Sequence, residues 1–458
     1  MELAGELARL VGEDAVLTAG MGAYATDSTE GRGLRGWPDA VVMPADAGAV
    51  AQVVAWCYHH GVPMVPRGGG TGFAGGAVPV DGGVVISLER LRRVRAFDPL
   101  LWRANVEAGL TTAEVQRLAR ESGLDFPPNP GAAEQSQIGG NIATNAGGPR
   151  SFKYGATGEW VTGLEAVVAP GELISVGGPA RRDVAGYDLK RLLVGSEGTL
   201  GIVTAAWLRL LPAPAARLPV VALHADADSG CAALERVLGS GIRAASLEFL
   251  DEATIALAGG AFPADAAVSG FMTLAEADGS PEEVLRLRAE LEEALGEGAT
   301  RVLAPTDPNE VARIVTWRDG VSLIVSAQHG GKLSEDVAVP LDRLAEALAE
   351  VKSIAALHGL ETCAWGHAGD GIIHASFLVD RTDERQLDRA AEAAADLFAL
   401  ALRLGGTVTG EHGIGIAKAG QLQAQWPARA VELHEQVKRV FDPKNLFNPG
   451  KKLARPSL

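Results

Sequence analysis

Three glycine-rich segments beside short apolar runs constrain the fold of this chain more than any other feature of its sequence. They are PRGGGTGFAGGA at residues 66–77, PPNPGAAEQSQIGGNIATNAGG at 127–148 and GSEGTLGIV at 195–203. Glycine lets backbone N–H groups surround an anion, with Arg67 and Thr71 as further donors in the first segment. The third follows a strand-like run at 192–194 and leads into a strand predicted at 202–211. One such segment is also typical of a flexible loop. Three together indicate one large, extended cofactor.

The first segment also contains a dinucleotide-binding spacing, but its surroundings exclude NAD. Three of its glycines form G-x-G-x-x-G, and Glu89 stands where that motif places an acid. In the motif the glycines open a helix that faces the pyrophosphate. Here a helix with an acidic cap is predicted at 46–60 and a strand at 62–65. Prolines and glycines between residues 76 and 83 exclude a helix before the next strand, at 84–88. Glu89 is therefore interpreted as an acid at a strand end.

The composition of the 458-residue chain excludes several classes of protein. A net charge of -16 and a pI near 5.1 argue against nucleic-acid binding, which needs a clustered basic face. No apolar run is long enough for a membrane span, and the N-terminal residues are acidic where a secretory signal is basic, so a cytoplasmic protein is expected. Cys57, Cys231 and Cys363 are far apart, which predicts neither disulfides nor an iron–sulfur cluster in this chain.

The second half of the chain contains a predicted histidine hairpin. In WGHAGDGIIHASF, Asp370–Gly371 is typical of a two-residue type I′ turn. Pairing outward from that turn sets His367 opposite His374, with Cβ atoms roughly 5 Å apart, close enough to bind one metal ion. A lone histidine is more often a structural residue, but two paired histidines favour a metal, and one carboxylate would complete three ligands. TVTGEHGIG, which follows a predicted helix, offers Glu411 for that role, with His412 beside it.

Taken in order, the motifs of this chain resemble those of the FAD-linked oxidases of the vanillyl-alcohol oxidase type. The branch that it resembles contains the glycolate oxidase flavin subunit, D-lactate dehydrogenase and D-2-hydroxyglutarate dehydrogenase. The resemblance extends from about residue 24 to residue 453. Each motif alone is weak, but the ordered set is highly specific. It consists of the three glycine-rich segments, KYGATGEWVTGLEAVV, GYDLKRLLVGSEGTLGIVTAAWLRLLPAP, WGHAGDGIIHASF, TVTGEHGIG and FDPKNLFNPGKKL.

The resemblance implies an α+β fold in three parts. Residues 1–215 would form an FAD-binding domain of the PCMH type with two α+β subdomains. Residues 216–424 would form an α+β substrate-cap domain with an antiparallel sheet, and residues 425–458 a C-terminal segment that returns to the FAD domain. Several prolines between residues 210 and 219 break regular structure at the first boundary. Relatives with covalent flavin often carry histidine in the glycine loop, where this chain has Thr71, so noncovalent FAD is expected.

The resemblance also assigns residues to the FAD. It places the pyrophosphate in the 66–72 loop and the flavin over residues 127–148 and 195–203. Most of the expected contacts belong to the three glycine-rich segments. The expected cofactor-binding residues are Pro66, Arg67, Gly68, Gly69, Gly70, Thr71, Gly72, Pro128, Ile138, Gly139, Gly140, Asn141, Ala143, Thr144, Gly148, Glu197, Gly198, Gly201, Ile202 and Asn448.

For the catalytic centre, the resemblance implies a metal and a base. His367, His374 and Glu411 would bind a divalent metal, expected to be zinc, and His412 would be the base. The metal would orient a 2-hydroxy acid and acidify its hydroxyl group. His412 would take the hydroxyl proton while the α-hydrogen leaves as hydride to flavin N5, which yields the 2-oxo acid.

A cationic group is expected to hold the substrate carboxylate. Arg318, Ser322 one helical turn further on, and Lys332 resemble the carboxylate-holding set of the family. Arg318 and Lys332 are therefore included among the expected catalytic residues. Without the resemblance, these two cations would be interpreted as solvated surface charge. Glu335 and Asp336 are expected to position a strand rather than to catalyse.

Two departures from the family pattern bear on the substrate. Relatives commonly read G-D-G-N before the second histidine, where this chain has Ile372 in place of the asparagine. Hydroxyglutarate dehydrogenases have asparagine two residues after that histidine, where this chain has Ser376. The loss of both amides weakens the expectation of a second substrate carboxylate. D-Lactate, glycolate or a longer aliphatic 2-hydroxy acid is therefore expected, with D-2-hydroxyglutarate as the alternative.

Partners and two other classes of function stay open. Glycolate oxidase relatives pass electrons to separate subunits, so an iron–sulfur partner or soluble acceptor is expected, with oxygen as an alternative. Such a partner would bring the protein to the inner face of the membrane, and a homodimer is also open. A metal-dependent hydrolase would explain the histidines and Glu411 but not the glycine-rich segments. A flavin-binding subunit without turnover would explain the segments but not the metal ligands.

Overall fold

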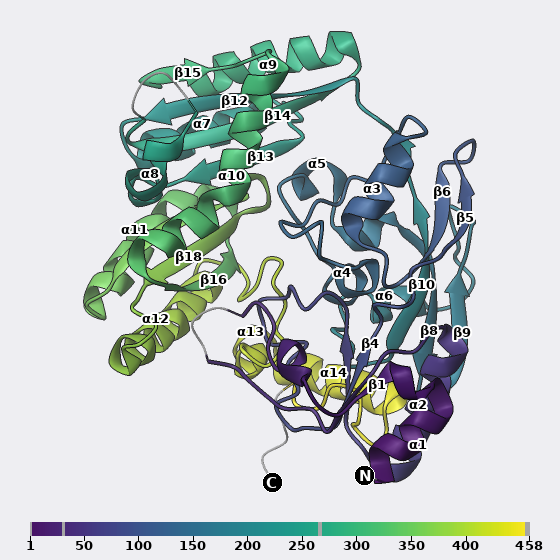
Figure 1. Ribbon diagram of the computed structural model, residues 1–458. Helices are drawn as coiled ribbons and strands as arrows, with labels where there is room; N and C mark the ends of the chain where they lie inside the picture. Colours follow the sequence, from purple (N-terminus) through teal and green to yellow (C-terminus); the bar gives the residue numbers. More distant parts are fainter. Residues whose placement is uncertain (1, 30–32, 264–267, 454–458) are drawn as a thin grey trace.

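The computed structural model describes residues 2–29, 33–263 and 268–453. Within these residues the strands form three larger sheets and one short pair. Two of the larger sheets come from the first 215 residues, which are purple to blue in Figure 1, and the third comes from the teal and green part at its upper left. Mixed helices and antiparallel sheets confirm the predicted α+β class. No helix of the described ranges is long and apolar enough to cross a membrane.

The first sheet is mainly parallel, in the order β1-β2-β4-β3. Its strands are β1 (Val16–Leu17), β2 (Ala40–Val42), β4 (Val84–Ser87) and β3 (Met64–Arg67), with helices α1 (Glu2–Val11) and α2 (Ala47–His60). Asp46 caps α2 as predicted, because its carboxylate accepts a hydrogen bond from the N–H of Ala49. The next strand begins at Met64 rather than at Val62, since the N–H of Val62 closes the helix by donating to Cys57 O. The first glycine-rich segment then connects β3 to β4 without a helix, as predicted.

The second sheet is antiparallel, in the order β5-β6-β10-β8-β9. Its strands are β5 (Val94–Asp98), β6 (Arg103–Glu107), β10 (Ile202–Arg209), β8 (Val161–Val168) and β9 (Glu172–Gly177), and β7 (Leu124–Asp125) pairs with β11 (Leu211–Pro212). Around them lie α3 (Thr112–Arg120), α4 (Ile138–Thr144), α5 (Ser151–Tyr154) and α6 (Leu189–Leu193). The strand predicted at 192–194 is wrong. The Asp188 carboxylate accepts from the N–H of Arg191 and starts the helix α6 instead, and so short an apolar run does not distinguish the two.

The third sheet has seven antiparallel strands, in the order β15-β12-β14-β13-β17-β18-β16. They are β15 (Arg301–Leu303), β12 (Ala216–His224), β14 (Phe271–Gly279), β13 (Ser246–Leu250), β17 (Glu361–Gly366), β18 (Ile372–Leu378) and β16 (Lys332–Ala338). The helices are α7 (Ala227–Gly239), α8 (Glu252–Ala258), α9 (Pro281–Gly296), α10 (Pro308–His329), α11 (Leu344–Leu357) and α12 (Glu384–Arg403). Because side chains alternate along each strand, the two faces of this sheet have different neighbours.

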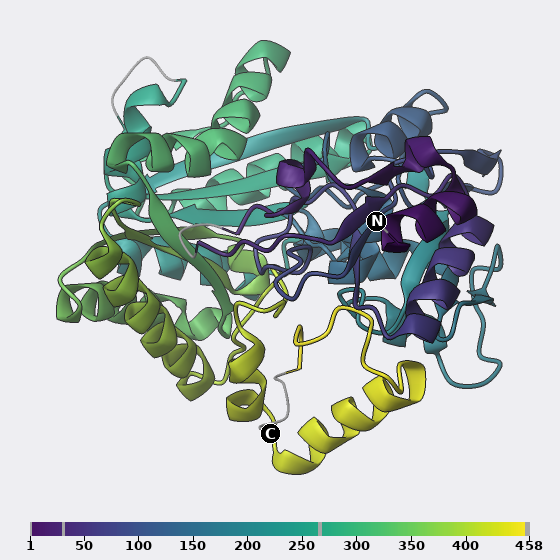
Figure 2. The same ribbon diagram turned by 60° about the horizontal axis from the view of Figure 1, so that its bottom comes forward.

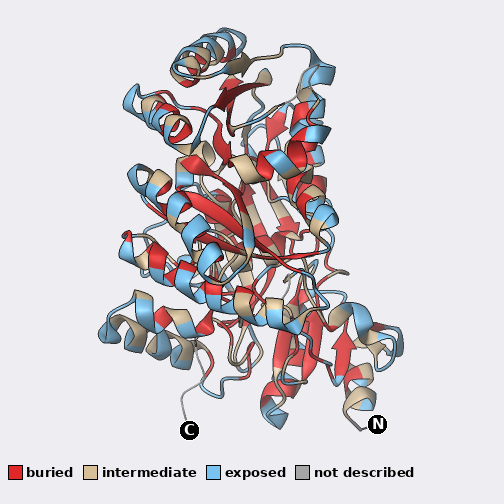
Figure 3. Ribbon diagram, turned by 90° about the vertical axis from the view of Figure 1, so that its left-hand side faces the viewer, coloured by how far each residue is buried: buried red, intermediate tan, exposed pale blue. Residues whose placement is uncertain are grey.

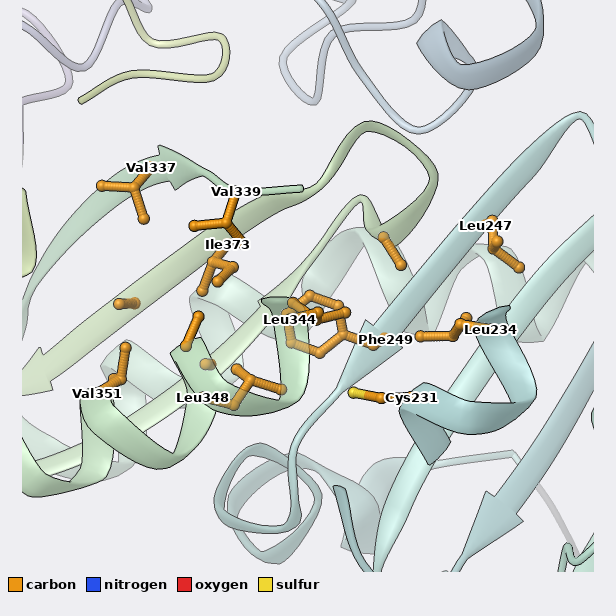
Figure 4. Packing of buried hydrophobic residues seen from close by; sticks show 14 of the residues in the cluster. Cys231, Leu234, Leu247, Phe249, Val337, Val339, Leu344, Leu348, Val351 and Ile373 are labelled. Carbon is orange, nitrogen blue, oxygen red and sulfur yellow. The ribbon is translucent and has the colours of Figure 1, made fainter. Parts of the chain in front are cut away.

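One face of the third sheet packs on α7, α9, α11 and α12, and the other faces α8, α10 and the inside of the molecule. Figure 4 shows Leu344 and Leu348 of α11 and Leu234 of α7 on the helix side of Phe249 and Ile373 in the sheet. In Figure 3 the strands of this layer are mostly buried, whereas the outer faces of its helices are exposed. The sheet therefore has one face for the core and one face for a site.

The chain ends by returning to the first sheet. After α13 (Leu422–Gln425) and α14 (Ala428–Phe441), which are yellow in Figure 2, Leu446 O accepts a hydrogen bond from Met64 N at 2.8 Å. Asn448 N donates to Met64 O at 2.8 Å, and Phe447 is fully buried among residues of β2, β4 and α2. This contact places residues 446–451 directly behind the first glycine-rich segment.

A buried lysine in this return makes the stability dependent on pH. Lys451 Nζ donates to Gly76 O at 2.9 Å and to Asn448 Oδ1 at 2.8 Å. Burial lowers the pKa of Lys451 to about 7, although nearby carboxylates favour its charge. Since the lysine of the unfolded chain keeps its proton up to about pH 10.4, the unfolded state binds more protons in the window between these values. The contribution of Lys451 to the free energy of unfolding is therefore smallest below pH 7 and increases as the pH rises above 7.

We expect the wild type to gain about 1.4 kcal/mol of unfolding free energy per pH unit relative to Lys451→Met between about pH 7.5 and 9.5. Below about pH 6.5 the difference between the two proteins should be constant. Urea unfolding at several pH values measures it, with Lys444→Met at an exposed position as the control. A difference that stays the same from pH 6 to 9 would show that Lys451 is not perturbed.

Candidate active site

A cavity of about 1050 Å³ lies between the glycine-rich segments and the inner face of the third sheet. All three segments line it from one side. From the other side it is lined by side chains of β13, β14, β16, β17, β18 and α10, and by the 411–412 turn. The cavity therefore combines the expected cofactor region with the expected catalytic residues. The catalytic, substrate-binding and metal-binding candidates all line the cavity. They are Arg318, Ser322, Lys332, His367, His374, Glu411 and His412.

The first glycine-rich segment has the properties of a phosphate cradle. Its residues 68–72 are all described, and their backbone N–H groups have no hydrogen-bond acceptor in the described part of the chain. Gly70 has a φ of +68°, and a Cβ at Gly69 would lie 2.1 Å from Gln135 O, so the second segment packs against a bare backbone. Free N–H groups on such a loop suit an anion.

The Arg67 guanidinium, which the sequence predicts to support an anion, lines the cavity but also binds backbone carbonyls. Its guanidinium donates to the backbone carbonyls of Ala23 at 2.9 Å and Thr26 at 2.8 Å, and it is buried. Buried carbonyl groups of the N-terminal region need donors, and Arg67 supplies two of them. Thr71 lines the cavity, as predicted for a further donor.

Most residues expected to bind FAD line the cavity, but three do not. Ile138 is fully buried in the core, and Pro128 presents its carbonyl to Gln116 Nε2 at 2.9 Å. Asn448 donates to the carbonyls of Gly76 and Glu197, which joins two of the glycine-rich segments from behind. The expected residues that line the cavity are Pro66, Arg67, Gly68, Gly69, Gly70, Thr71, Gly72, Gly139, Gly140, Asn141, Ala143, Thr144, Gly148, Glu197, Gly198, Gly201 and Ile202.

Glu197 lines the cavity, but its carboxylate is engaged elsewhere. Oε1 accepts from the N–H of Ile414 at 3.0 Å, Oε2 from Gly415 at 2.6 Å, and Lys452 Nζ lies 3.1 Å from Oε1. The side chain thus ties the third glycine-rich segment to the turn after His412. Through these hydrogen bonds Glu197 connects the two sides of the cavity.

The histidine hairpin forms with a register that differs from the prediction. His374 of β18 pairs with Trp365 of β17, not with His367. Residues 368–370 form a 3-10 turn, so four residues separate His367 from Ile372, whose N–H donates to His367 O at 3.0 Å. The local 3-10 hydrogen bonds compete successfully with a two-residue turn. Gly371 has a φ of +71°, and a Cβ there would lie 1.9 Å from Val339 O, so this position requires glycine.

The two histidines nevertheless converge with Glu411. Their ring centroids are 5.3 Å apart and nearly perpendicular, which is possible because His367 lies in the turn and not in the ladder. Glu411 Oε1 lies 3.4 Å from Nε2 of each histidine. The three potential ligand atoms lie within 4.8 Å of one another, so the predicted set can hold one metal ion. Two imidazole nitrogens and one carboxylate oxygen suit zinc and similar divalent ions.

Electrostatics support the same convergence. Burial opposes the charge of His367, but the carboxylates of Glu248 and Glu411 outweigh it and raise the pKa of His367 to about 10. Burial also opposes the charge of Glu411, yet His367 and His374 hold its pKa well below the usual range. Two acids and two histidines therefore share a buried site in which a cation is favoured.

Asp336 holds the turn that carries Glu411 and His412. Its Oδ2 accepts hydrogen bonds from the N–H groups of Gly410, Glu411 and His412 at 2.7, 2.6 and 3.0 Å. Lys418 Nζ, also buried, donates to Oδ1 at 2.5 Å. Although burial opposes its charge, these donors and His412 keep the pKa of Asp336 far below the usual range. The sequence predicts only a strand-positioning role for Asp336, whereas in the structure this carboxylate also organises the turn that carries Glu411 and His412.

His412 faces the cavity with a neutral ring. Its Nδ1 lies 3.3 Å from Asp336 Oδ1, so Nε2 is the nitrogen available to a ligand. Burial, opposed by Asp336, lowers the pKa of His412 to about 4. The ring of Phe73 from the first glycine-rich segment lies 4.7 Å away, and His374 stacks at 5.2 Å. A neutral, oriented imidazole in a cavity is suited to accept a proton.

The expected carboxylate-holding set depends on Glu248, which sequence analysis missed. Glu248 Oε1 accepts from His367 Nδ1 at 2.5 Å, and its Oε2 pairs with Arg318. Lys332 Nζ donates to Ser322 Oγ at 2.9 Å and lies 4.9 Å from the ring centroid of Trp365. Glu248 therefore orients one metal-ligand candidate and one carboxylate-binding candidate at once. The only signal in the sequence is an acid within the apolar strand SLEFL.

Two family models match the chain. One describes the FAD binding domain and covers residues 38–177. The other describes the C-terminal domain of FAD linked oxidases and covers residues 213–452. Together they span both sides of the cavity.

Curated relatives are similar over nearly the whole chain. The glycolate oxidase subunit GlcD of Bacillus subtilis is 36% identical, over 95% of this chain and 93% of its own. A D-lactate dehydrogenase of Archaeoglobus fulgidus is 34% identical, over 90% of each chain. A D-2-hydroxyglutarate dehydrogenase of Xanthomonas citri pv. viticola is also 34% identical, over 90% and 89%.

A solved structure of p-cresol methylhydroxylase matches the fold. Its TM-score is 0.79, over 99% of this chain and 96% of that one, at 17% sequence identity. At this identity the likeness concerns the fold alone. It confirms the predicted PCMH-type architecture.

Proposed function

This chain belongs to the FAD-linked oxidase family, and on that premise we propose that it oxidises a D-2-hydroxy acid of the lactate or glycolate type to the 2-oxo acid. The observation that carries the proposal is the shared cavity. A backbone cradle for a cofactor phosphate and a cluster of histidines, Glu411 and Arg318 line the same space. Neither a hydrolase nor a binding subunit needs both.

The residues of the cavity divide the work on such a substrate. Arg318, with Ser322 and Lys332, would hold the carboxylate. Nε2 of His412 would take the hydroxyl proton, while Asp336 keeps the ring in place. When bound, FAD supplies the acceptor for the α-hydrogen and its electron pair at N5. When bound by His367, His374 and Glu411, a divalent metal, proposed to be zinc, acidifies the hydroxyl group.

We extend the proposal to the parts of the chain and its partners. Residues 1–215 and 425–458 would bind FAD without a covalent link, and residues 216–424 would cover it and bind the substrate. The three cysteines are buried and widely separated along the chain, which does not suit a second redox centre. Electrons would therefore leave to a separate acceptor, for which an iron–sulfur subunit is one candidate.

A 2-hydroxyglutarate dehydrogenase is the second candidate, because one relative of similar identity carries that name. The test for both is an anaerobic visible spectrum of metal-replete protein, before and after addition of glycolate or of either enantiomer of lactate or 2-hydroxyglutarate. We expect a yellow protein that is bleached by a D-2-hydroxy acid. A colourless protein that takes up no FAD would favour a metal-dependent hydrolase. A yellow protein that none of these acids bleaches would favour a flavin-binding subunit without turnover.

A further inference from the structure

The wall of the cavity around Arg318 contains several aliphatic side chains. On α10, Ile314, Arg318 and Ser322 follow at intervals of four residues and therefore lie in one row along the helix. Val315, Asp319 and Leu323 form the adjacent row, and all six side chains line the cavity. The carboxylate-binding candidates Arg318 and Ser322 thus share this part of the helix with the aliphatic side chains of Ile314, Val315 and Leu323.

The inner face of the third sheet extends this apolar surface. Leu274 of β14 lies directly opposite Glu248 of β13, the residue that holds Arg318. Leu274 packs in one hydrophobic cluster with Ile314 and Trp365, and all three line the cavity. A substrate whose carboxylate reaches Arg318 therefore has an apolar surface beside it.

The charges next to this surface disfavour a second carboxylate. Two residues after Leu274 on β14, and on the same face of the strand, is Glu276, which also lines the cavity. Arg150, the cation closest to it, is held by Glu276 through two hydrogen bonds of 2.7 and 3.1 Å. Asp319 adds another acid on α10. A distal carboxylate would meet Glu276 and Asp319, with Arg150 already engaged.

We propose that the preferred substrate is a 2-hydroxy monocarboxylic acid with an aliphatic side chain longer than a methyl group. This inference rests on the proposed function. Leu274, Ile314 and Val315 contact that side chain, and Glu276 excludes dicarboxylic acids by holding Arg150. Buried methylene groups then add to binding, at about 0.8 kcal/mol each, which corresponds to about a fourfold gain in efficiency.

The first test is the rate of anaerobic flavin reduction by D-isomers of increasing length, at substrate concentrations below saturation. From lactate to 2-hydroxybutyrate to 2-hydroxypentanoate we expect about a fourfold increase per methylene, with glycolate slowest. 2-Hydroxyglutarate has the same five-carbon chain as 2-hydroxypentanoate and differs only in its terminal carboxylate. We expect it to be slower than 2-hydroxypentanoate by about 100-fold, because that charge is buried beside acids.

The second test removes the acid that holds Arg150. Glu276→Gln should raise the rate of flavin reduction by 2-hydroxyglutarate by at least about tenfold, since a freed Arg150 can pair with the distal carboxylate. The rate with 2-hydroxypentanoate should change by less than about threefold. Glu282→Gln, at an exposed position of α9, is the control. Val315→Thr replaces one methyl group by a hydroxyl group at an exposed position, so it leaves the core packing unchanged. It should reduce the preference for 2-hydroxypentanoate over lactate, and this outcome is decisive even when Glu276→Gln is unstable.

Failure of this inference differs from failure of the proposed function. Reduction that is fastest with glycolate or 2-hydroxyglutarate, or an unchanged chain-length preference in Val315→Thr, would overturn the inference and leave the proposed function standing. A flavin that no 2-hydroxy acid reduces would overturn both.

Discussion

His412→Ala should keep the bound flavin and slow its reduction by a 2-hydroxy acid by about 100- to 10,000-fold, the range typical of a lost general base. The structure gives the reason. Nδ1 of His412 lies 3.3 Å from Asp336, its side chain is only 14% exposed, and its pKa is lowered to about 4, mainly by burial. A neutral imidazole is thus held against the cavity, and no other histidine of the described residues is anchored to Asp336.

The measurement is anaerobic stopped-flow reduction of the flavin, with the metal content determined on the same sample. Unchanged flavin and metal contents would separate the loss of a proton acceptor from the loss of a binding site. His434→Ala, at an exposed position of α14, is the matched control. Undiminished reduction in His412→Ala would remove His412 from the mechanism.

Glu411→Ala should lower the metal content of the purified protein and weaken metal affinity by at least about 100-fold, while the flavin stays bound. Its Oε1 lies 3.4 Å from Nε2 of both His367 and His374, so removal leaves two imidazoles without the carboxylate that completes the set. Loss of this buried negative charge also leaves any bound cation less compensated.

Elemental analysis and metal titration of the flavin-loaded protein measure this effect. Glu350→Ala replaces a surface carboxylate of α11 that pairs with Arg403 and is the matched control. An unchanged metal content in Glu411→Ala would refute the ligand assignment.

Features that depend on neighbouring residues could be predicted from the sequence. Asp46 and Gly61 delimit α2 because a cap and a left-handed glycine act within one turn of the helix. The prolines and glycines after Gly75 exclude a helix for equally local reasons, and this was enough to separate the first segment from an NAD-binding loop. The order of the motifs then identified the family.

Features that depend on competition between local and distant contacts could not be predicted. The Asp370–Gly371 pair does produce a turn, but 3-10 hydrogen bonds extend it and shift the register, so His374 faces Trp365. Arg67 stands in the first glycine-rich segment, yet it donates hydrogen bonds to the carbonyls of Ala23 and Thr26, more than 40 positions away. Spacing along the chain does not show which of two partners a side chain selects.

The sequence by itself determined the glycine-rich segments, the residue types of the candidate centre and the family, because each is a property of residues close together in the chain. Only the tertiary structure decided how the centre is held together. Glu248 joins His367 to Arg318 across 119 and 70 positions, and Asp336 fixes His412 from 76 positions away. A buried carboxylate needs donors, and folding brings those donors from separate strands and turns. The roles of Glu248 and Asp336 are therefore set by the packing of the third sheet against the 409–412 turn.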